Sequence, residues 1–141
     1  MTGTIWMKLA AEIVIAFGIL LVAEVLIGTA GLANWVVDLA FWPLDGGQNL
    51  TAPETRIMMA IGGGVMIGWG VTLLYVVGPI AAAAPDLARR TIMVAMLCWY
   101  VPDSAGSLAS GAWVNVIGNT IFLAMFLEPI MWQRRWVKAL A

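Results

Sequence analysis

Long runs of apolar residues dominate the chain, and polar positions are mostly confined to short stretches between them. The runs are about as long as the roughly 20 residues that a membrane-spanning helix needs. None of them alternates apolar and polar residues, as the strands of a membrane barrel would. The pattern predicts an all-α polytopic membrane protein with four transmembrane helices in an up-down bundle. The predicted helices lie near residues 5–28, 55–78, 88–101 with an extension over 102–110, and 112–132.

The composition agrees with this class. Hydrophobic residues make up 62% of the chain, charged residues make up only 11%, and the mean hydropathy is +0.95. These values lie outside the range of soluble globular domains. Four helices leave no room for a second domain, so residues 1–141 are expected to form a single transmembrane domain. Because Glu12 and Glu24 interrupt the first run, we expect a retained helix rather than a cleaved signal peptide.

The segments between the runs predict shorter elements. Residues 34–42 are too few to span a bilayer but are amphipathic, which favours a short helix in the interface between helices 1 and 2, with Asn34 as its cap. Residues 51–54, with Pro53, have the pattern of a capping box at the start of the second transmembrane helix. The Gly-, Pro- and Ala-rich residues 78–86 predict a tight turn.

The distribution of basic residues predicts the orientation. Nearly all of them fall on one side of a four-pass topology, which places both termini in the cytoplasm by the positive-inside rule. The other side carries mainly acidic residues and only Arg56. The basic residues of the inner side are Lys8, Arg89, Arg90, Arg134, Arg135 and Lys138.

Polar residues within the predicted helices form the first candidate site. Glu24, Arg56 and Asp103 are expected at a similar depth near the outer face. An unpaired charge costs roughly 2.5–3.5 kcal/mol at the centre of a bilayer and less toward its surface, so pairing is expected, with Arg56 tied to Asp103 or Glu24. Two asparagines four residues apart add amides on one helix face. The predicted cluster comprises Glu24, Arg56, Asp103, Ser104, Asn115 and Asn119.

Two interpretations of this cluster remain open. Arginine–carboxylate pairs and asparagines stabilise small bundles in lipid, where helices have no hydrophobic drive to associate. Alternatively, the cluster binds a small amphiphile such as a quinone, an isoprenoid or a lipid in the outer leaflet. In either case the chain ligates no cofactor by itself, and bound lipid or quinone is the only expected small molecule.

A stripe of small residues is the second candidate feature. Starting from Arg56, the second predicted helix has Ala60, Gly64, Gly68 and Thr72 at intervals of four. Such a face lets another helix approach closely, either from the same chain or from a second copy. The alternative is a slot for a flat or threadlike apolar ligand whose polar head meets Arg56. The sequence favours a helix-packing groove.

Several kinds of chemistry lack the residues that they need. The chain has no histidine, which excludes bis-histidine haem ligation and most metal sites. Cys98 is the single cysteine and cannot form an internal disulfide, and Ser104 has no histidine base. There is no phosphate-cradling loop and no basic face for nucleic acid. We therefore expect no catalytic centre, no metal site and no nucleic-acid partner.

Two short motifs suggest a family. The second predicted helix opens with Glu54, Arg56, Ala60, Gly63 and Gly64, and a turn with the sequence Asp-Ser-Ala-Gly-Ser covers residues 103–107. With four helices in about 140 residues, the chain resembles small bacterial DoxX-like membrane proteins. The resemblance implies a four-helix bundle in a bacterial inner membrane, often without known activity, with some relatives linked to quinone-coupled oxidoreductase complexes. It also implies that Arg56 and Asp103 are the family's helix-2 arginine and acidic turn.

These observations lead to three hypotheses about function. The first is a non-catalytic accessory or assembly subunit that packs against other membrane helices in a larger or oligomeric complex. The second is a binder or carrier of a small amphiphile at the outer-leaflet cluster, or the quinone-facing part of an oxidoreductase. The third is a small oligomeric transporter.

Overall fold

The computed structural model describes residues 2–132, and helices make up most of this range. Four of the described helices are long and apolar enough to cross a bilayer, and a short helix lies between the first two. The predicted all-α architecture is therefore confirmed, and the chain is a multi-pass membrane protein. The elements are α1 (Thr2–Ile27), α2 (Gly31–Phe41), α3 (Pro53–Tyr75), the π-helical segment η1 (Val76–Ile80), α4 (Ala81–Ala83), α5 (Pro85–Ser110) and α6 (Trp113–Trp132).

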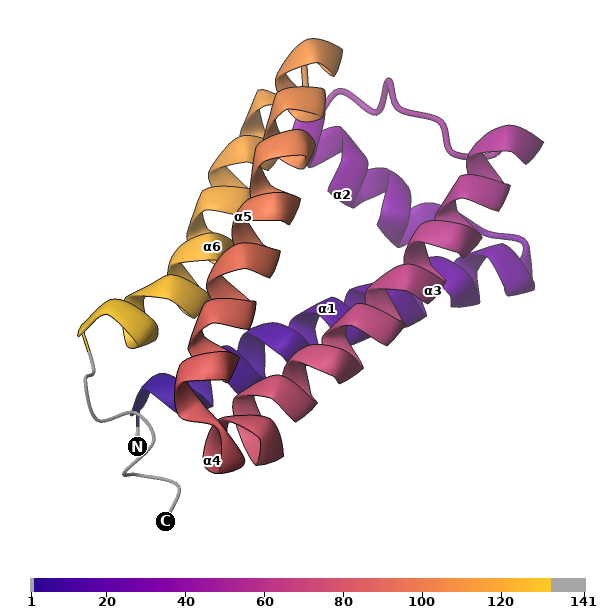
Figure 1. The fold of residues 1–141 in the computed structure, drawn as a ribbon. Coiled ribbons are helices and arrows are strands. Elements are labelled where there is room, and N and C mark those ends of the chain that lie inside the picture. The colour runs from indigo at the N-terminus through magenta and orange to yellow at the C-terminus, as the bar shows by residue number, and fades with distance from the viewer. Residues whose placement is uncertain (1, 133–141) are drawn as a thin grey trace.

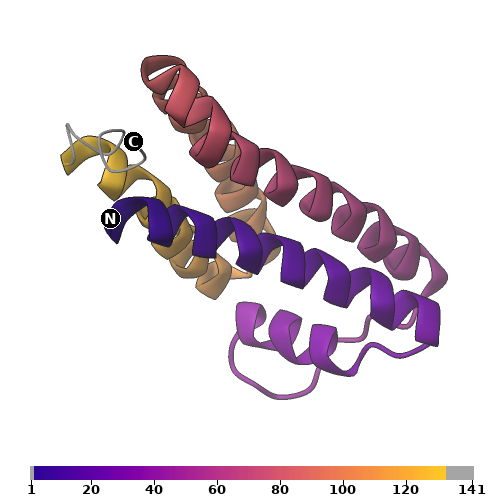
Figure 2. The same ribbon diagram turned by 90° about the horizontal axis from the view of Figure 1, so that it is seen from below.

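The long helices form two antiparallel pairs that meet at one end and diverge at the other (Figure 1). α1 packs along α3, and α5 packs along α6. Figure 2 shows α1 and α3 side by side from a second direction, with α2 lying next to α1. α2 contacts both α1 and α6, so it connects the two pairs at the wide end of the bundle. The start of α1 and the end of α6 lie at the same end, as an even number of crossings requires.

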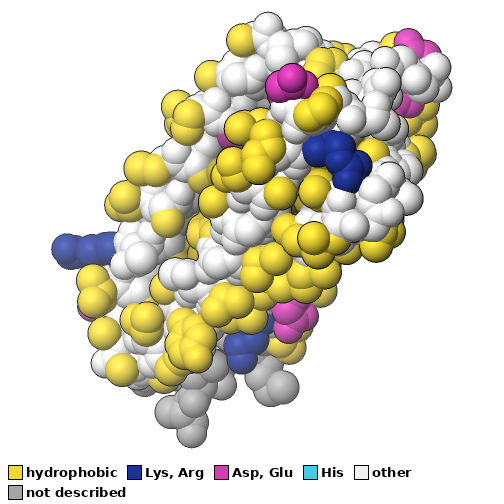
Figure 3. Space-filling model, turned by 90° about the vertical axis from the view of Figure 1, so that its right-hand side faces the viewer, with side chains coloured by type: hydrophobic (Ala, Val, Ile, Leu, Met, Phe, Trp, Pro, Cys, Tyr) yellow, Lys and Arg dark blue, Asp and Glu magenta, His cyan; other side chains and the backbone are white. Residues whose placement is uncertain are grey.

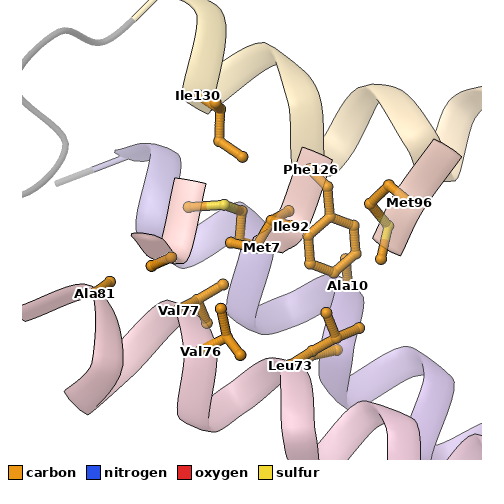
Figure 4. Close-up of a cluster of buried hydrophobic side chains, with 12 residues drawn as sticks. Met7, Ala10, Leu73, Val76, Val77, Ala81, Ile92, Met96, Phe126 and Ile130 are labelled. Atoms are coloured by element: carbon orange, nitrogen blue, oxygen red, sulfur yellow. The ribbon is translucent and has the colours of Figure 1, made fainter. Parts of the chain in front are cut away.

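The buried core lies at the narrow end, where all four long helices contribute side chains (Figure 4). Met7 of α1, Ile92 and Met96 of α5, and Phe126 of α6 are fully buried there, together with Val77 of η1. Elsewhere, many large hydrophobic side chains are exposed, and they cover much of the face shown in Figure 3. Such a surface suits contact with lipid tails. The core holds the four long helices together at the narrow end and thereby fixes the positions of the helix ends at the wide end.

Small residues allow α1 and α3 to approach closely. A Cβ atom added at Gly63 would lie 2.7 Å from the carbonyl oxygen of Gly18, and one added at Gly70 would lie 2.9 Å from that of Ala11. The contacting positions are seven residues apart on both helices. A seven-residue repeat keeps facing positions on one seam of a helix pair. The seam joins the two helices so tightly that no side chain fits between them at Gly63.

The predicted stripe faces away from this seam. A Cβ atom added at Gly64 or Gly68 would meet nothing within 4 Å. Both glycines and Thr72 are exposed, and Ala60 is half-buried. A spacing of four residues rotates by roughly 40° per step around a helix, so the stripe diverges from the α1–α3 seam, which repeats every seven residues. The glycines of α3 that pack against α1 are therefore Gly63 and Gly70, and the stripe itself stays open.

The chain reverses direction within the predicted turn over residues 78–86, but through two breaks rather than one tight turn (Figure 1). The first break is a kink at Gly78, whose φ of −101° and ψ of −106° are not helical, within the segment η1 that also contains Pro79. The second is at Ala84, which ends α4 with a φ of −143°. Proline removes a helical hydrogen bond and its ring displaces the preceding turn, so a break beside Pro79 is expected. Pro102, in contrast, does not interrupt α5, which runs from Pro85 to Ser110.

Two predicted helix caps also differ from the structure. α2 begins at Gly31, so Asn34 lies inside the helix, where its side-chain oxygen accepts a hydrogen bond from the Leu50 amide at 3.0 Å. α3 has Ala52 as its N-cap and no side-chain cap, while Thr51 bonds to Asn49 instead. Only the proline at the first turn of α3 is confirmed. The C-terminal basic residues Arg134, Arg135 and Lys138 lie outside the described residues.

Candidate binding site at the wide end of the bundle

The six predicted cluster residues occupy three separate places. Glu24 binds the start of α2, and Arg56 binds the end of α1. The other four lie between α5 and α6. Arg56 donates its hydrogen bonds to backbone carbonyls, so the prediction that it is tied to Asp103 or Glu24 is wrong. One predicted cluster is in fact two helix caps and a separate polar site.

The N-cap residue of α2 is Ala30, but the side chain that caps this helix end comes from Glu24 of α1. Its carboxylate is buried, and its two oxygens accept hydrogen bonds from the backbone amides of Leu32 at 2.8 Å and Ala33 at 3.1 Å. The first amides of a helix have no partner within the helix, and the positive end of its dipole favours a carboxylate. Gly28, with φ of +79°, reverses the chain between Glu24 and α2. Glu24 therefore fixes where α2 begins.

Arg56 has the opposite role at the end of α1. Its guanidinium donates hydrogen bonds to the carbonyl oxygens of Val25 and Thr29. The last carbonyls of a helix lack helical partners, and the negative end of its dipole favours a cation. Arg56 also lies seven residues before Gly63 on the α1–α3 seam. It thus closes the seam at the wide end of the bundle.

Replacing Arg56 with alanine should lower the stability of the protein by about 1–3 kcal/mol, because two carbonyls lose a charged donor. Arg89, which is exposed near the start of α5, is the matched control, and Arg89→Ala should leave the melting temperature nearly unchanged. Thermal unfolding in detergent compares them. Adding Asp103→Asn should give additive losses, since the two side chains are not partners; partial recovery in the double variant would contradict the assignment.

The site between α5 and α6 is built around Asp103. Its Oδ1 accepts hydrogen bonds from the side-chain amides of Asn119 at 2.7 Å and Asn115 at 3.2 Å. The Ser107 hydroxyl donates to the backbone carbonyl of Asp103 at 2.8 Å and lies 3.3 Å from Oδ1. Asn115 also donates to Ser107 at 2.9 Å, and Asn119 donates to Ser104 at 3.4 Å. Ser104, Ser107 and Asn119 are buried. These five residues are called the Asp103 cluster below.

Ser107 is the member of this cluster that the predicted set omits. It follows Asp103 by four residues on the same helix, and this spacing puts the two side chains on one face. The same rule identified Asn115 and Asn119 on α6. The spacing of four residues could thus have identified Ser107 from the sequence. Using it requires that the helix continue through Pro102, as it does in the structure.

The Asp103 cluster lies well inside the span of its helices. Asp103 comes seven residues before the end of α5, and Asn119 comes six residues after the start of α6. At 1.5 Å per residue, both lie about 10 Å from the helix ends that meet at the α5–α6 turn. α5 is long enough to cross the bilayer, so this depth falls within the half of the membrane nearer the wide end of the bundle. A charged group at such a depth marks a candidate functional site.

The remaining hydrogen-bonding capacity of the cluster consists of acceptors. Both N–H groups of Asn115 and of Asn119 are used within the cluster. Asp103 Oδ2 and the two amide oxygens have no hydrogen-bond partner among the described residues. No buried side-chain nitrogen or oxygen of the described chain lacks a partner, so these three oxygens reach the surface. A quinone carbonyl needs a donor, and the amide donors are already taken.

Aromatic side chains lie one turn inward from Asp103. Trp99 precedes Asp103 by four residues on α5, and its ring centroid is 5.5 Å from that of Trp69 on α3 and 5.9 Å from that of Phe122 on α6. The Tyr100 hydroxyl and the Thr120 hydroxyl are 3.0 Å apart, which links α5 to α6 beside the cluster. Because residues four apart share a helix face, Asp103 lies on the side of α5 from which Trp99 reaches α3.

Comparison of the chain with protein-family models, with curated proteins and with solved structures finds no match. The resemblance to DoxX-like proteins therefore stays a prediction.

Proposed function

We propose that this protein is a non-catalytic subunit of a bacterial cytoplasmic membrane complex, and that it associates with another membrane helix through the exposed stripe of α3. The observation that supports this most directly is the open space at Gly64 and Gly68. The stripe comprises Ala60, Gly64, Gly68 and Thr72. The partner is a second copy of the chain or a helix of another subunit.

The cost of glycine supports this role. A glycine inside a helix is roughly 1 kcal/mol less favourable than an alanine, and here no contact within the described chain offsets that cost at Gly64 or Gly68. In lipid, helices associate through close van der Waals contact, which small residues at intervals of four permit. The α1–α3 seam shows that this chain already uses glycine in that way at Gly63. A contact partner for the stripe explains why its glycines are tolerated.

The charge distribution supports the proposed orientation. Arg89 and Arg90 lie exposed near the start of α5, at the same end of the bundle as the start of α1. The linker after α2 carries Asp45 at the opposite end. Basic residues gather on the cytoplasmic side of membrane proteins. This arrangement favours cytoplasmic termini and an outer position for α2.

The association is tested by filling the stripe with bulk. The double variant Gly64→Leu, Gly68→Leu should release the partner, so that the particle mass measured by light scattering in mild detergent falls to that of one chain. Gly118→Leu is the matched control, because Gly118 is also an exposed helical glycine with nothing within 4 Å. It should keep the wild-type mass. A wild-type particle that already contains one chain, or a double variant that keeps its partner, would refute the proposal.

A further inference from the structure

We infer that the Asp103 cluster is a binding site for a lipophilic organic cation, with the carboxylate of Asp103 facing the positive charge and Trp99 facing the apolar body. This site is separate from the exposed stripe of α3, so the inference does not depend on the proposed association. It rests on the charge balance of the cluster, its free acceptors and its aromatic neighbours.

No basic side chain of the described residues forms an ion pair with Asp103. Two neutral amide donors converge on Oδ1, and such an arrangement complements a negative charge and holds the carboxylate in one orientation. Arg56, the cation predicted to pair with Asp103, is occupied at the end of α1. Oδ2 remains free to accept at the surface. In the low dielectric of a membrane, one negative charge is best balanced by one positive charge.

The orientation of the amides argues against a small inorganic ion. Asn115 and Asn119 both approach Asp103 through nitrogen, so their oxygens do not converge with the carboxylate on one point. A hard cation such as Ca²⁺ needs six to eight oxygen ligands, and no group of three or more acidic, histidine or cysteine side chains that could hold a metal occurs within residues 2–132. A cation that needs one carboxylate and a surrounding apolar surface fits this cluster better.

The aromatic neighbours supply that surface. Trp99 lies one turn inward of Asp103 and is in contact with Trp69 and Phe122. Cations bind the faces of aromatic rings, most strongly those of tryptophan, and an apolar cation reaches this depth from the lipid phase. An ammonium or phosphonium centre at Oδ2 with its substituents against Trp99 satisfies both features. The recognised ligand is thus defined by one positive charge and an apolar, preferably aromatic, body.

Equilibrium dialysis of the purified protein in detergent tests this directly, with tetraphenylphosphonium as the probe and triphenylphosphine oxide as its neutral counterpart. The wild-type protein should bind the phosphonium ion more tightly than the neutral compound by about tenfold or more. Asp103→Asn preserves the shape of the side chain and should remove this preference. Asp86→Asn, which changes an exposed acidic residue at the other end of α5, should retain it.

Trp99→Leu is a second variant that leaves the hydrogen bonds of the cluster intact, and it should weaken phosphonium binding by about fivefold, which is a typical loss of one cation–π contact. If Asp103→Asn does not fold, the phosphonium binding of Trp99→Leu tests the inference instead. Equal binding of the charged and neutral probes by the wild-type protein would overturn the inference. So would unchanged phosphonium binding in either variant, or displacement of the phosphonium by sodium chloride but not by choline chloride, which would indicate an inorganic ion site.

Discussion

Replacing Gly63 with alanine is expected to destabilise the protein by about 2–3 kcal/mol, the cost of overpacking a close contact. The added Cβ would lie 2.7 Å from the carbonyl oxygen of Gly18 and 2.9 Å from Cγ2 of Val22. The nearer atom belongs to the backbone and cannot rotate away, so α1 and α3 must separate along their seam. Thermal unfolding in detergent, followed by circular dichroism, measures the loss.

Gly64→Ala is the matched control, one residue along the same helix. Its added Cβ meets nothing within 4 Å, and alanine favours a helix over glycine by roughly 1 kcal/mol, so the melting temperature should stay the same or rise. The pair of variants separates the packing seam from the exposed stripe. Equal destabilisation by both would show that helix α3 presents a different face to α1.

The second large effect is expected at Glu24. Glu24→Ala removes both acceptors at the start of α2 and leaves the amides of Leu32 and Ala33 without their partners. A buried unpaired amide costs about 1–3 kcal/mol, so a loss of about 2 kcal/mol is expected. Hydrogen exchange of the α2 amides should accelerate as well, because α2 loses its cap before the rest of the bundle unfolds.

Glu54 provides the control for this change. It lies exposed in the first turn of α3, and Glu54→Ala should alter the stability little. Glu24→Gln keeps a side-chain acceptor and should recover part of the loss. Matching melting temperatures and α2 exchange rates for the Glu24 and Glu54 alanine variants would show that α2 is held by other contacts, such as those with α6.

Glu24 and Arg56 show where reasoning from sequence is weakest. Both were identified as charged groups at the same end of the bundle, and a carboxylate and a guanidinium at one depth favour an ion pair. The actual partners are backbone amides and carbonyls at helix ends. These groups carry no residue signature, and they become available only where a helix begins or stops. The start of α2 lies at Gly31 rather than near the predicted residue Asn34. This small difference changes the residue that caps the helix from Asn34 to Glu24.

The Asp103 cluster was more predictable. The sequence predicts Asp103 and Ser104 together with Asn115 and Asn119 from their similar depth and from the spacing of four between the asparagines. In the structure α5 and α6 run antiparallel, so residues at equal distances from the turn lie at equal depth. The hydrogen bonds among them confirm that grouping. The free acceptor capacity required the coordinates, since it depends on which end of each amide faces the carboxylate.

The sequence by itself determined the membrane class, the four spans and the short helix after the first. The length and hydropathy of each apolar run are local properties, and they decide whether a helix can cross a bilayer. Only the tertiary structure decided which glycines touch. Gly63 and Gly64 are neighbours in sequence, yet Gly63 packs against the backbone of Gly18 and Gly64 contacts no other helix of the described chain. About 100° of helical rotation separates them, and the face that turns inward is set by the partner helix and by the seven-residue seam that both helices share.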